Sequence, residues 1–493
     1  MVSSETRAKY RATIGIECHV QLKTKSKLFS AAGNDAREAP PNTLVNHIDF
    51  GLPGALPVVN EEVIHLATRA AFALGTVPQK FSKFERKHYF YPDLPMGYQI
   101  SQLAEPIVIG GHVNLVVDEK PVTVQINRIQ IEADAGKNTH PVNKDYSLVD
   151  LNRAGTPLLE IVSEADMHSP AEAKAYVREL YLRVKYADIS DANLYYGNMR
   201  FDVNVSVSKT DELGTRSETK NINSFRAVEK SAEYEIKRQI EQLEKGEAVV
   251  QETRGWDDVK QKTLSQRGKE EAHDYRYMPD PDLPPVTLDD DYINKVKSEM
   301  PIMPEEWRQR LVSLGLDVLQ IETLLESQVE LSTDFLSLIE SNLHDADKAK
   351  TFANWITNIE VPLRREVLDK TQNLVIDDAV RRTVFDEVYI LVSAKKLSST
   401  KAKALLTELL ATNKQPDSVE EYATQNDYIQ VSDEAEVAEI VKLVLSENAK
   451  AAEDVKNGEM KAIGFLVGQV MKRSQGKANP QLAQELIKKQ LPE

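Results

Sequence analysis

The stretch "ATIGIECHVQLKTKSKLFS", residues 12–30, decides the fold class, because its first half alternates as a β-strand does. Apolar side chains occupy the even positions of residues 14–22 and are expected to face a core. The odd positions carry Glu17 and His19, which would share the opposite face with Cα atoms about 7 Å apart. Such a pair is also typical of an ordinary solvated strand face, so it indicates either a functional site or a solvent-exposed surface.

Further alternating runs predict strands over residues 122–131, 158–162 and 199–207. Helical patterns lie between them, over residues 61–74, from residue 170 behind the capping box of Ser169 and Glu172, and from the residue after Asn223 to Lys245. The alternation lacks the regular repeat of a doubly wound sheet. The sequence therefore predicts an α+β fold with a mixed sheet and helices in its N-terminal part.

Composition bounds the class of protein. A chain of 493 residues exceeds the usual size of a single core, so several domains are expected. The net charge of −16 argues against a non-specific nucleic-acid binder, although residues 456–493 carry seven cations and only three carboxylates. On charge alone, that basic end is more typical of a solvated helix face. A single cysteine, Cys18, excludes an intrachain disulfide framework and any multi-cysteine zinc site.

The chain shows no run of about 18 apolar residues and no apolar segment of a secretion signal near residue 1, so a cytoplasmic protein without a membrane span is expected. A proline-rich break, "YMPDPDLPPVTLDDDY" at residues 277–292, separates the strand-rich part from a region of amphipathic helices. A weaker break follows near residues 397–418. The predicted domains are residues 1–292, 293–405 and 406–493, the last two helical.

The polar strand faces carry an unusual number of charged groups for strand centres. These residues are Glu17, His19, Glu132, Asp134, Glu160, Arg200, Asp202 and Asn204. Carboxylates are the hard oxygen ligands that Mg²⁺ prefers, and Arg or Lys can hold phosphate. The sequence has no P-loop, GxSxG, HExxH or CxxC motif, so a bound nucleotide would be held differently. A solvated antiparallel face is the alternative.

Motifs along the whole chain carry a resemblance to a known family. They are "IGIECHVQLKTKSKLFS", "GLPGALPVVN", "KHYFYPDLPMGYQISQ", "IEADAGK", "SLVDLNRAGTPLLEIVSE", "MRFDVNVSV", "ETKNINSF", "DYRYMPDPDLPP" and "KAIGFLVGQVMKRSQGKANPQLAQELI". In this order they resemble the B subunits of the tRNA-dependent aspartyl/glutamyl amidotransferases, the GatB/GatE family. The resemblance implies a cradle domain, an all-α helical domain and a helical tail of the YqeY type.

The resemblance implies the kinase step of transamidation. ATP would phosphorylate the side-chain carboxylate of Glu on tRNA(Gln) or of Asp on tRNA(Asn), and ammonia would then displace phosphate to give the amide. Ammonia would arrive through a channel from a separate amidase (A) subunit, and a small C subunit would complete a heterotrimer. The implied cofactors are ATP and Mg²⁺. No membrane partner is implied.

The family's motifs also imply roles for individual residues. The implied catalytic and metal-holding residues are Glu17, His19, Glu132 and Glu160. Residues implied to contact ATP or the aminoacyl end are Lys87, Arg200, Asp202, Asn204 and Lys220. Residues of the basic end implied to approach tRNA are Lys461, Lys472, Arg473 and Lys477.

The chain departs from the family pattern at three places. Many members carry a C-x-C…C-x-x-C set after the first strand, where this chain has Ser30, Ala32, Asn46 and Asp49, so no zinc is expected. The usual "EGS" before the Arg-x-Asp strand is Tyr196-Gly197-Asn198 here, and a frequent Arg is Ser208. No family role is therefore expected at these flanking positions, whereas the core set keeps its implied roles.

Overall fold

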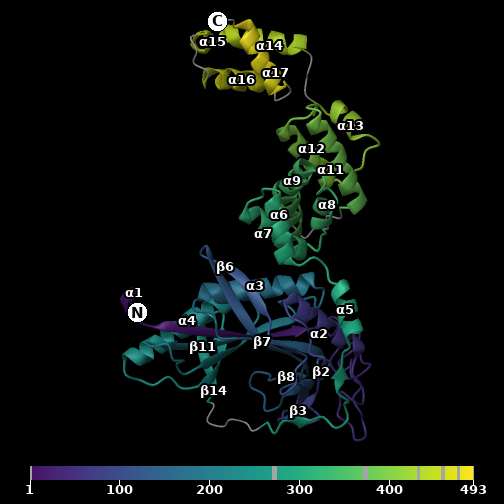
Figure 1. Ribbon diagram of the computed structural model, residues 1–493, viewed down its shortest axis with the longest axis vertical. Helices are drawn as coiled ribbons and strands as arrows, with labels where there is room; N and C mark the ends of the chain where they lie inside the picture. The colour runs from purple at the N-terminus through teal and green to yellow at the C-terminus, as the bar shows by residue number, and fades with distance from the viewer. Residues whose placement is uncertain are drawn as a thin grey trace. The chain divides into compact units, whose positions relative to one another are not determined.

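The computed structural model describes residues 3–268, 275–369, 376–429, 434–456, 461–474 and 478–491. The chain divides into two compact units, residues 1–306 and 307–493 (Figure 1). The first mixes sheet and helices and the second is helical, which confirms the predicted α+β class. The three-domain division stays a prediction, and its boundaries fall inside the helices Asp290–Ser298 and Ser399–Ala411.

The strands lie in the first unit. In chain order they are β1 (Arg11–Gln21), β2 (Phe81–Ser82), β3 (Glu85–His88), β4 (Tyr98–Ser101), β5 (Val108–Ile109), β6 (His112–Val117), β7 (Lys120–Ala133), β8 (Lys137–Thr139), β9 (Leu148–Asp150), β10 (Pro157–Ser163), β11 (Met199–Ser208), β12 (Ser217–Ile222), β13 (Glu252–Asp257), β14 (Lys262–Gly268), β15 (Met278–Pro279) and β16 (Val286–Thr287). The main sheet has the order β14-β13-β12-β11-β1-β10-β7-β5, with β6 also paired to β7.

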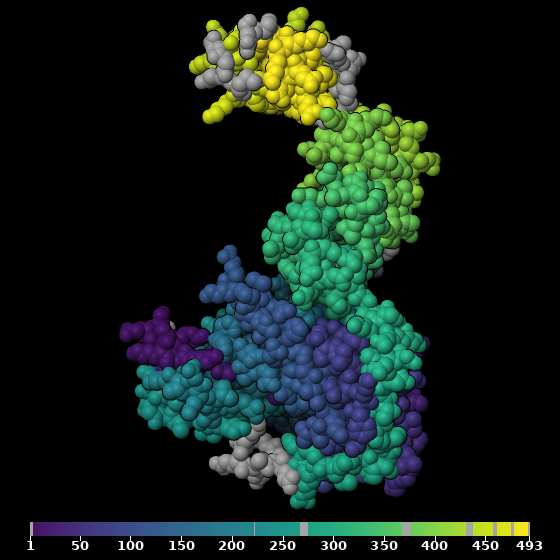
Figure 2. Space-filling view, in the orientation of Figure 1, coloured from purple at the N-terminus to yellow at the C-terminus, as the bar shows by residue number. Residues whose placement is uncertain are grey.

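The helices of this unit are α1 (Ser4–Arg7), α2 (Glu61–Ala73), α3 (Pro170–Tyr186), α4 (Phe225–Glu244) and α5 (Asp290–Ser298). Ser169 caps α3 as predicted, with Pro170 in its first turn. The cap of α4 is Ser224, whose side chain accepts from the Ala227 amide, so the helix follows Asn223 as predicted. The hairpin of β6 and β7 projects from the surface (Figures 1 and 2).

The apolar face of β1 is buried, as the alternation predicted. Ile14, Cys18 and Leu22 are fully buried and pack in one core with residues of α3 and α4. In Figure 1, α3 and α4 lie on one side of the main sheet, and β3 and β8 lie on the other. The second side is only partly covered, by the small sheet β15-β3-β4. The polar face of β1 is therefore left lining a trough.

The helices of the C-terminal part are α6 (Pro304–Ser313), α7 (Val318–Glu330), α8 (Leu336–Glu340), α9 (Ala346–Trp355), the π-helical turn η1 (Ile356–Glu360), α10 (Val361–Asp369), α11 (Asp378–Ser393), α12 (Ser399–Ala411), α13 (Val419–Gln425), α14 (Glu434–Glu447), α15 (Ala449–Lys456), α16 (Lys461–Arg473) and α17 (Pro480–Gln490). Asn479 caps α17 and Pro480 opens it, as predicted. The α14, α16 and α17 helices share a small apolar core.

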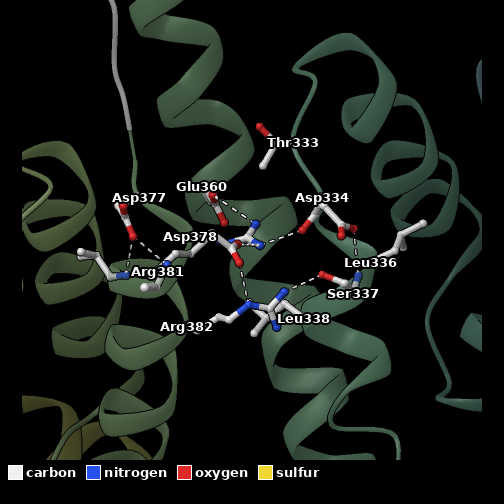
Figure 3. Close-up of polar contacts among 12 residues, drawn as sticks. Thr333, Asp334, Leu336, Ser337, Leu338, Glu360, Asp377, Asp378, Arg381 and Arg382 are labelled. Carbon is white, nitrogen blue, oxygen red and sulfur yellow. Dashed lines mark hydrogen bonds and ion pairs between the residues drawn. The ribbon is translucent and has the colours of Figure 1, made fainter.

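Buried charges join α8, η1 and α11 in this helical part (Figure 3). Arg381 is 1% exposed, and its Nη2 donates to the Asp334 carbonyl at 2.7 Å and to Asp378 Oδ1 at 2.5 Å. Its Nη1 lies 3.7 Å from Glu360 Oε1, and Arg364 donates to the same oxygen at 2.8 Å. The π-helical turn ends where Pro362, which has no amide hydrogen, follows.

Among the described residues, none of the helices combines the length and the apolar character that crossing a membrane requires.

Candidate functional site

The polar groups predicted from separate strands meet on one face of the main sheet. In the antiparallel register His19 of β1 lies opposite both Glu160 of β10 and Arg200 of β11. Glu17 lies opposite Asp202 on β11. Residues opposite each other in such a ladder point to the same side, so the trough collects charges from five adjacent strands, β12 to β7.

The first group of ligand-type atoms comprises His19, Glu132 and Glu160, with one atom of each within 4.8 Å of the others. His19 Nε2 lies 3.4 Å from Glu132 Oε1. Gln130 Nε2 donates to Glu160 Oε2 at 2.6 Å, and Ser101 Oγ donates to Glu132 Oε2 at 3.2 Å. Both carboxylates are buried, so each is held in place by a neutral donor from β7 or β4.

Opposing charges set the protonation of this first group. Burial by itself disfavours the charged His19, but its hydrogen bond to Glu132 and the charge of Glu160 raise its pKa to about 9. Burial likewise opposes ionisation of Glu132, yet His19 lowers the pKa of Glu132 to about 2. Burial and then the charge of Glu132 raise the pKa of Glu160 to about 7. The pair of His19 and Glu132 is thus satisfied, whereas burial and the charge of Glu132 both oppose the ionisation of Glu160.

The second group comprises Glu17, Asp202 and Glu218, again with one atom of each within 4.8 Å of the others. Lys220 Nζ lies 2.9 Å from Asp202 Oδ2 and 3.1 Å from Glu218 Oε1. Burial opposes its charge, but Asp202 and Glu218 raise the pKa of Lys220. The amide of Asn204 donates to Glu17 Oε1 at 3.1 Å, and its buried Oδ1 has no hydrogen-bond partner.

Three further cations, Lys87, Arg153 and Arg200, lie among these groups. Arg200 Nη2 donates to Asp134 Oδ2 at 2.9 Å, and the same oxygen lies 3.3 Å from Arg153 Nε. Asp134 therefore binds arginines and belongs to neither carboxylate group. Lys87 Nζ lies 5.0 Å from the ring centroid of Tyr275. Burial opposes the charge of Lys87, but the nearby charges of Glu132 and Glu160 raise its pKa.

Both groups suit a divalent cation by the chemistry of their donors. Each offers at least two carboxylates, which are the ligands that Mg²⁺ binds best, and the first adds one imidazole. The acceptor oxygen of Asn204, which has no partner, lies in a residue that contacts Glu17. A cation at either group would compete with His19 or Lys220 for the same carboxylates. The carboxylates of the trough can therefore hold cations, and Arg200 and Lys220 can hold phosphate oxygens beside them.

Comparisons with known proteins agree with this geometry. Residues 12–294 match the family model described as the GatB/GatE catalytic domain, and residues 337–491 match the one described as the GatB domain. The chain belongs to the GatB/GatE family.

Relatives named as the B subunit of aspartyl/glutamyl-tRNA(Asn/Gln) amidotransferase align over nearly the whole chain. The protein of Thermoanaerobacter pseudethanolicus is 43% identical over 486 residues, 98% of this chain and 99% of that protein. Those of Thermotoga maritima and Carboxydothermus hydrogenoformans are 41% identical over 491 residues and 39% over 489, with the same coverage. The GatB/GatE catalytic match includes every strand that lines the trough.

The carboxylates of this GatB/GatE member are grouped differently from what the sequence suggested, and one of them was missed. The four residues implied to hold one metal are divided, because Glu17 joins Asp202 and Glu218 instead of His19. Glu218 was missed as a candidate. Its signal was its position two residues before Lys220 in a strand, which puts both side chains on one face.

The positions that depart from the family's cysteine pattern form a compact hydrogen-bonded loop. Ser30 Oγ donates to both oxygens of Asp49, at 2.9 and 3.0 Å, and the Asn46 amide donates to Asp49 Oδ2 at 2.9 Å. The fully buried Lys27 places its Nζ 3.5 Å from that oxygen. Ala32 contributes its backbone: its amide donates to Ser30 Oγ at 3.4 Å, and its carbonyl accepts from the Lys27 amide at 3.0 Å.

The cations of the basic end lie far along the chain, in the helical unit. Lys461 and Lys472 are exposed at the two ends of α16. Arg473 is bound to Glu447 of α14, with Nη1 2.7 Å from Oε1. Lys477 lies outside the described residues.

Proposed function

We propose that this chain carries the ATP-dependent step of tRNA-dependent amidation in the cytoplasm, in a heterotrimer with an amidase subunit and a small C subunit. The substrate is Glu on tRNA(Gln) or Asp on tRNA(Asn). The single observation that carries the proposal is that Lys87, Arg200 and Lys220 lie with the two carboxylate groups on one face of the main sheet. The names of the full-length relatives support the reaction class.

The reaction needs no nucleophile from the enzyme, because the substrate's own carboxylate is ionised at neutral pH. Its oxygen attacks the γ-phosphorus of ATP and ADP leaves; ammonia then attacks the acyl carbon and phosphate leaves. Mg²⁺, when bound, would neutralise phosphate charge during the transfer. Phosphoryl transfer otherwise depends on positioning, which fixed groups on adjacent strands supply.

The residues of the trough have two proposed roles, binding cations and binding phosphate. His19, Glu132 and Glu160 would hold one cation, and Glu17, Asp202 and Glu218 a second. Lys220 and Arg200 are bound to carboxylates at 2.9 Å, and a phosphate can take over these cations when a metal takes over the carboxylates.

The test uses the complete complex with glutamyl-tRNA(Gln), ATP and glutamine. Glu160→Gln and Glu17→Gln keep side-chain volume and should each lower ATP-dependent glutaminyl-tRNA formation by about 100-fold or more, as loss of a fixed electrostatic group does. Glutaminase activity of the complex should stay measurable. Glu164→Gln is the matched control, since Glu164 is exposed just after the end of the same strand and its carboxylate bonds only Asn127 in the described residues. Near-normal amidation in both trough variants would refute the assignment.

A second function, anchoring tRNA through the basic end, is favoured by the two exposed lysines of α16. Lys461→Ala and Lys472→Ala should each weaken tRNA binding and reduce the slope of log affinity against log salt by about 1. Arg473→Ala should change the slope less, because Glu447 already neutralises Arg473. Unchanged slopes in both lysine variants would exclude α16 as the anchor.

A further inference from the structure

A second cavity opens beside the trough, beyond its Arg200 end. Its volume is about 520 Å³, and its lining includes Gln21, Asn34, Arg37, Lys137, Tyr196 and Asn198. None of these was assigned a role from the sequence. Gln21 follows His19 by two residues on the same face of β1, and Asn198 precedes Arg200 by two residues in the chain. The cavity therefore lies about 7 Å along the strand direction from the His19 position.

Two buried carboxamides in the lining have acceptor oxygens without partners. Asn34 is 4% exposed and Asn198 is 8% exposed, and the Oδ1 atom of each has no hydrogen bond. The orientation of Asn34 is settled, because its Nδ2 donates to the Leu22 carbonyl at 2.9 Å and a flipped amide would oppose two oxygens. Asn198 Nδ2 donates to Gln21 Oε1 at 3.0 Å. Buried acceptors without partners are rare, so this cavity suits a ligand that brings hydroxyl or amino donors.

The cavity also has an aromatic rim. Tyr196 lines it at 47% exposure, and Tyr195 beside it is 87% exposed, with the ring centroids 5.2 Å apart. Arg37 lies over the Tyr196 ring at 5.8 Å while Asp35 and Asp191 neutralise its charge. Exposed rings of this kind offer a face on which a nucleobase stacks.

The charges of the lining favour one phosphate over several. Lys23, Arg37 and Arg153 are each paired with an aspartate. Within the described part of the chain, Lys137 is the one cation of this lining without an ion pair or a side-chain hydrogen bond. A single free ammonium suits one phosphodiester better than a triphosphate.

We propose that this cavity receives the 3′-terminal adenosine of the aminoacyl-tRNA. The base stacks on Tyr196, the one ribose hydroxyl that the aminoacyl ester leaves free donates to Asn198 Oδ1, and Lys137 lies near the last phosphodiester. The amino acid esterified to that ribose then extends along β1 toward His19. This inference rests on the proposed function and adds the place where its RNA substrate is held.

The test measures binding of acceptor-stem RNA hairpins to the full complex by fluorescence anisotropy. One hairpin ends in CCA, one lacks the terminal adenosine, and one ends in 2′,3′-dideoxyadenosine. The wild type should bind the CCA hairpin at least about fivefold more tightly than the shortened one, as expected for a single stacked base. Loss of the ribose hydroxyls should cost about 2- to 10-fold.

Variants then assign these losses to residues. Tyr196→Ala should bring the preference for the terminal adenosine below about twofold, whereas Tyr146→Ala, which removes an exposed tyrosine outside the lining, should leave it unchanged. Asn198→Leu should make the CCA and dideoxy hairpins bind alike. Lys137→Ala should lower the salt slope by about 1 relative to Lys120→Ala. The hairpin series varies only the ligand and so does not depend on any variant folding.

The inference is overturned if the wild type does not prefer the terminal adenosine, or if Tyr196→Ala keeps that preference. It is also overturned if Tyr196→Ala raises the KM for ATP and leaves RNA binding alone, because the cavity would then serve the nucleotide. Amidation distinguishes the two proposals. If the wild-type enzyme is active but does not prefer the terminal adenosine, only the assignment of the cavity is wrong. If it prefers the adenosine and amidation survives Glu160→Gln and Glu17→Gln, only the assignment of the trough is wrong.

Discussion

The trough of the first unit and the buried arginine cluster of the helical unit both bury charges, but they balance them differently. In the trough, carboxylates from five strands outnumber the cations, and Glu160 has a raised pKa beside Glu132. In the helical cluster, Arg381 and Arg382 meet Glu360 and Asp378 (Figure 3). Arg364 also binds Glu360, so each carboxylate has at least one arginine partner. A cluster in which every carboxylate has an arginine partner can serve stability by itself, whereas a cluster with an excess of carboxylates needs a cation to complete it.

The largest stability effect is expected in the helical cluster. Glu360→Gln leaves Arg381, which is 1% exposed, without a buried counter-charge and should lower the unfolding free energy of this unit by about 3–5 kcal/mol. Hydrogen exchange of α11 amides measures the unit by itself, which a whole-chain melting temperature does not. The double variant Glu360→Leu/Arg381→Met should lose less than either single change. Simple additivity of the two losses would show that the pair is not coupled.

A balanced pair inside the first unit should behave in the same way. Asp49→Asn leaves the fully buried Lys27 unpaired and should cost about 3 kcal/mol. Burial lowers the pKa of Lys27 while Asp49 opposes it, so removing Asp49 lowers that pKa further. A lysine pKa depressed by folding destabilises the folded state below the unfolded value of about 10.4, and the deficit should shrink as pH rises toward it. Urea unfolding at pH 7 and pH 10 measures this.

The control is Asp211→Asn, because Asp211 forms an ion pair with Arg11 at the surface and its side chain is 99% exposed. That variant should lose less than about 1 kcal/mol. A deficit of Asp49→Asn that grows with pH would contradict the assignment of the buried charge to Lys27.

These contrasts also show what a sequence can predict. Strand alternation placed Glu17, His19 and Cys18 on the correct faces, because side-chain parity is a local property. It could not group Glu17 with Asp202, since the order and register of strands depend on pairing far along the chain. The ion pair of Glu360 and Arg381 could not be predicted for the same reason. Amphipathic periodicity predicts a helix, but it does not say which residue of another helix a polar side chain contacts.

In the trough, a carboxylate should contribute little to stability or oppose it. Glu160→Gln relieves repulsion with Glu132 while Gln130 still has a side-chain partner, so stability in EDTA should stay within about 1 kcal/mol of wild type or rise. Mg²⁺ should raise the melting temperature of the wild type more than that of Glu160→Gln, because a ligand stabilises only the state that binds it. Glu164→Gln should respond to Mg²⁺ as the wild type does. A loss of about 3 kcal/mol or more in EDTA would place Glu160 with the structural pairs.

The smallest effect is expected at the exposed edge of the helical cluster. Asp378 accepts from Arg382 at 2.7 Å, but its side chain is 58% exposed, so Asp378→Asn should cost about 1 kcal/mol or less. Burial opposes the shift, yet the arginines lower the pKa of Asp378, so its contribution is present above the unfolded value near 4 and disappears as pH falls through the lower folded value. Hydrogen exchange of α11 should therefore separate wild type from variant at pH 6 and less so at pH 3, whereas Asp417→Asn, in an exposed loop, should match wild type at both. An equal difference at both pH values would mean that the hydrogen-bonding shape of Asp378, rather than its charge, stabilises the cluster.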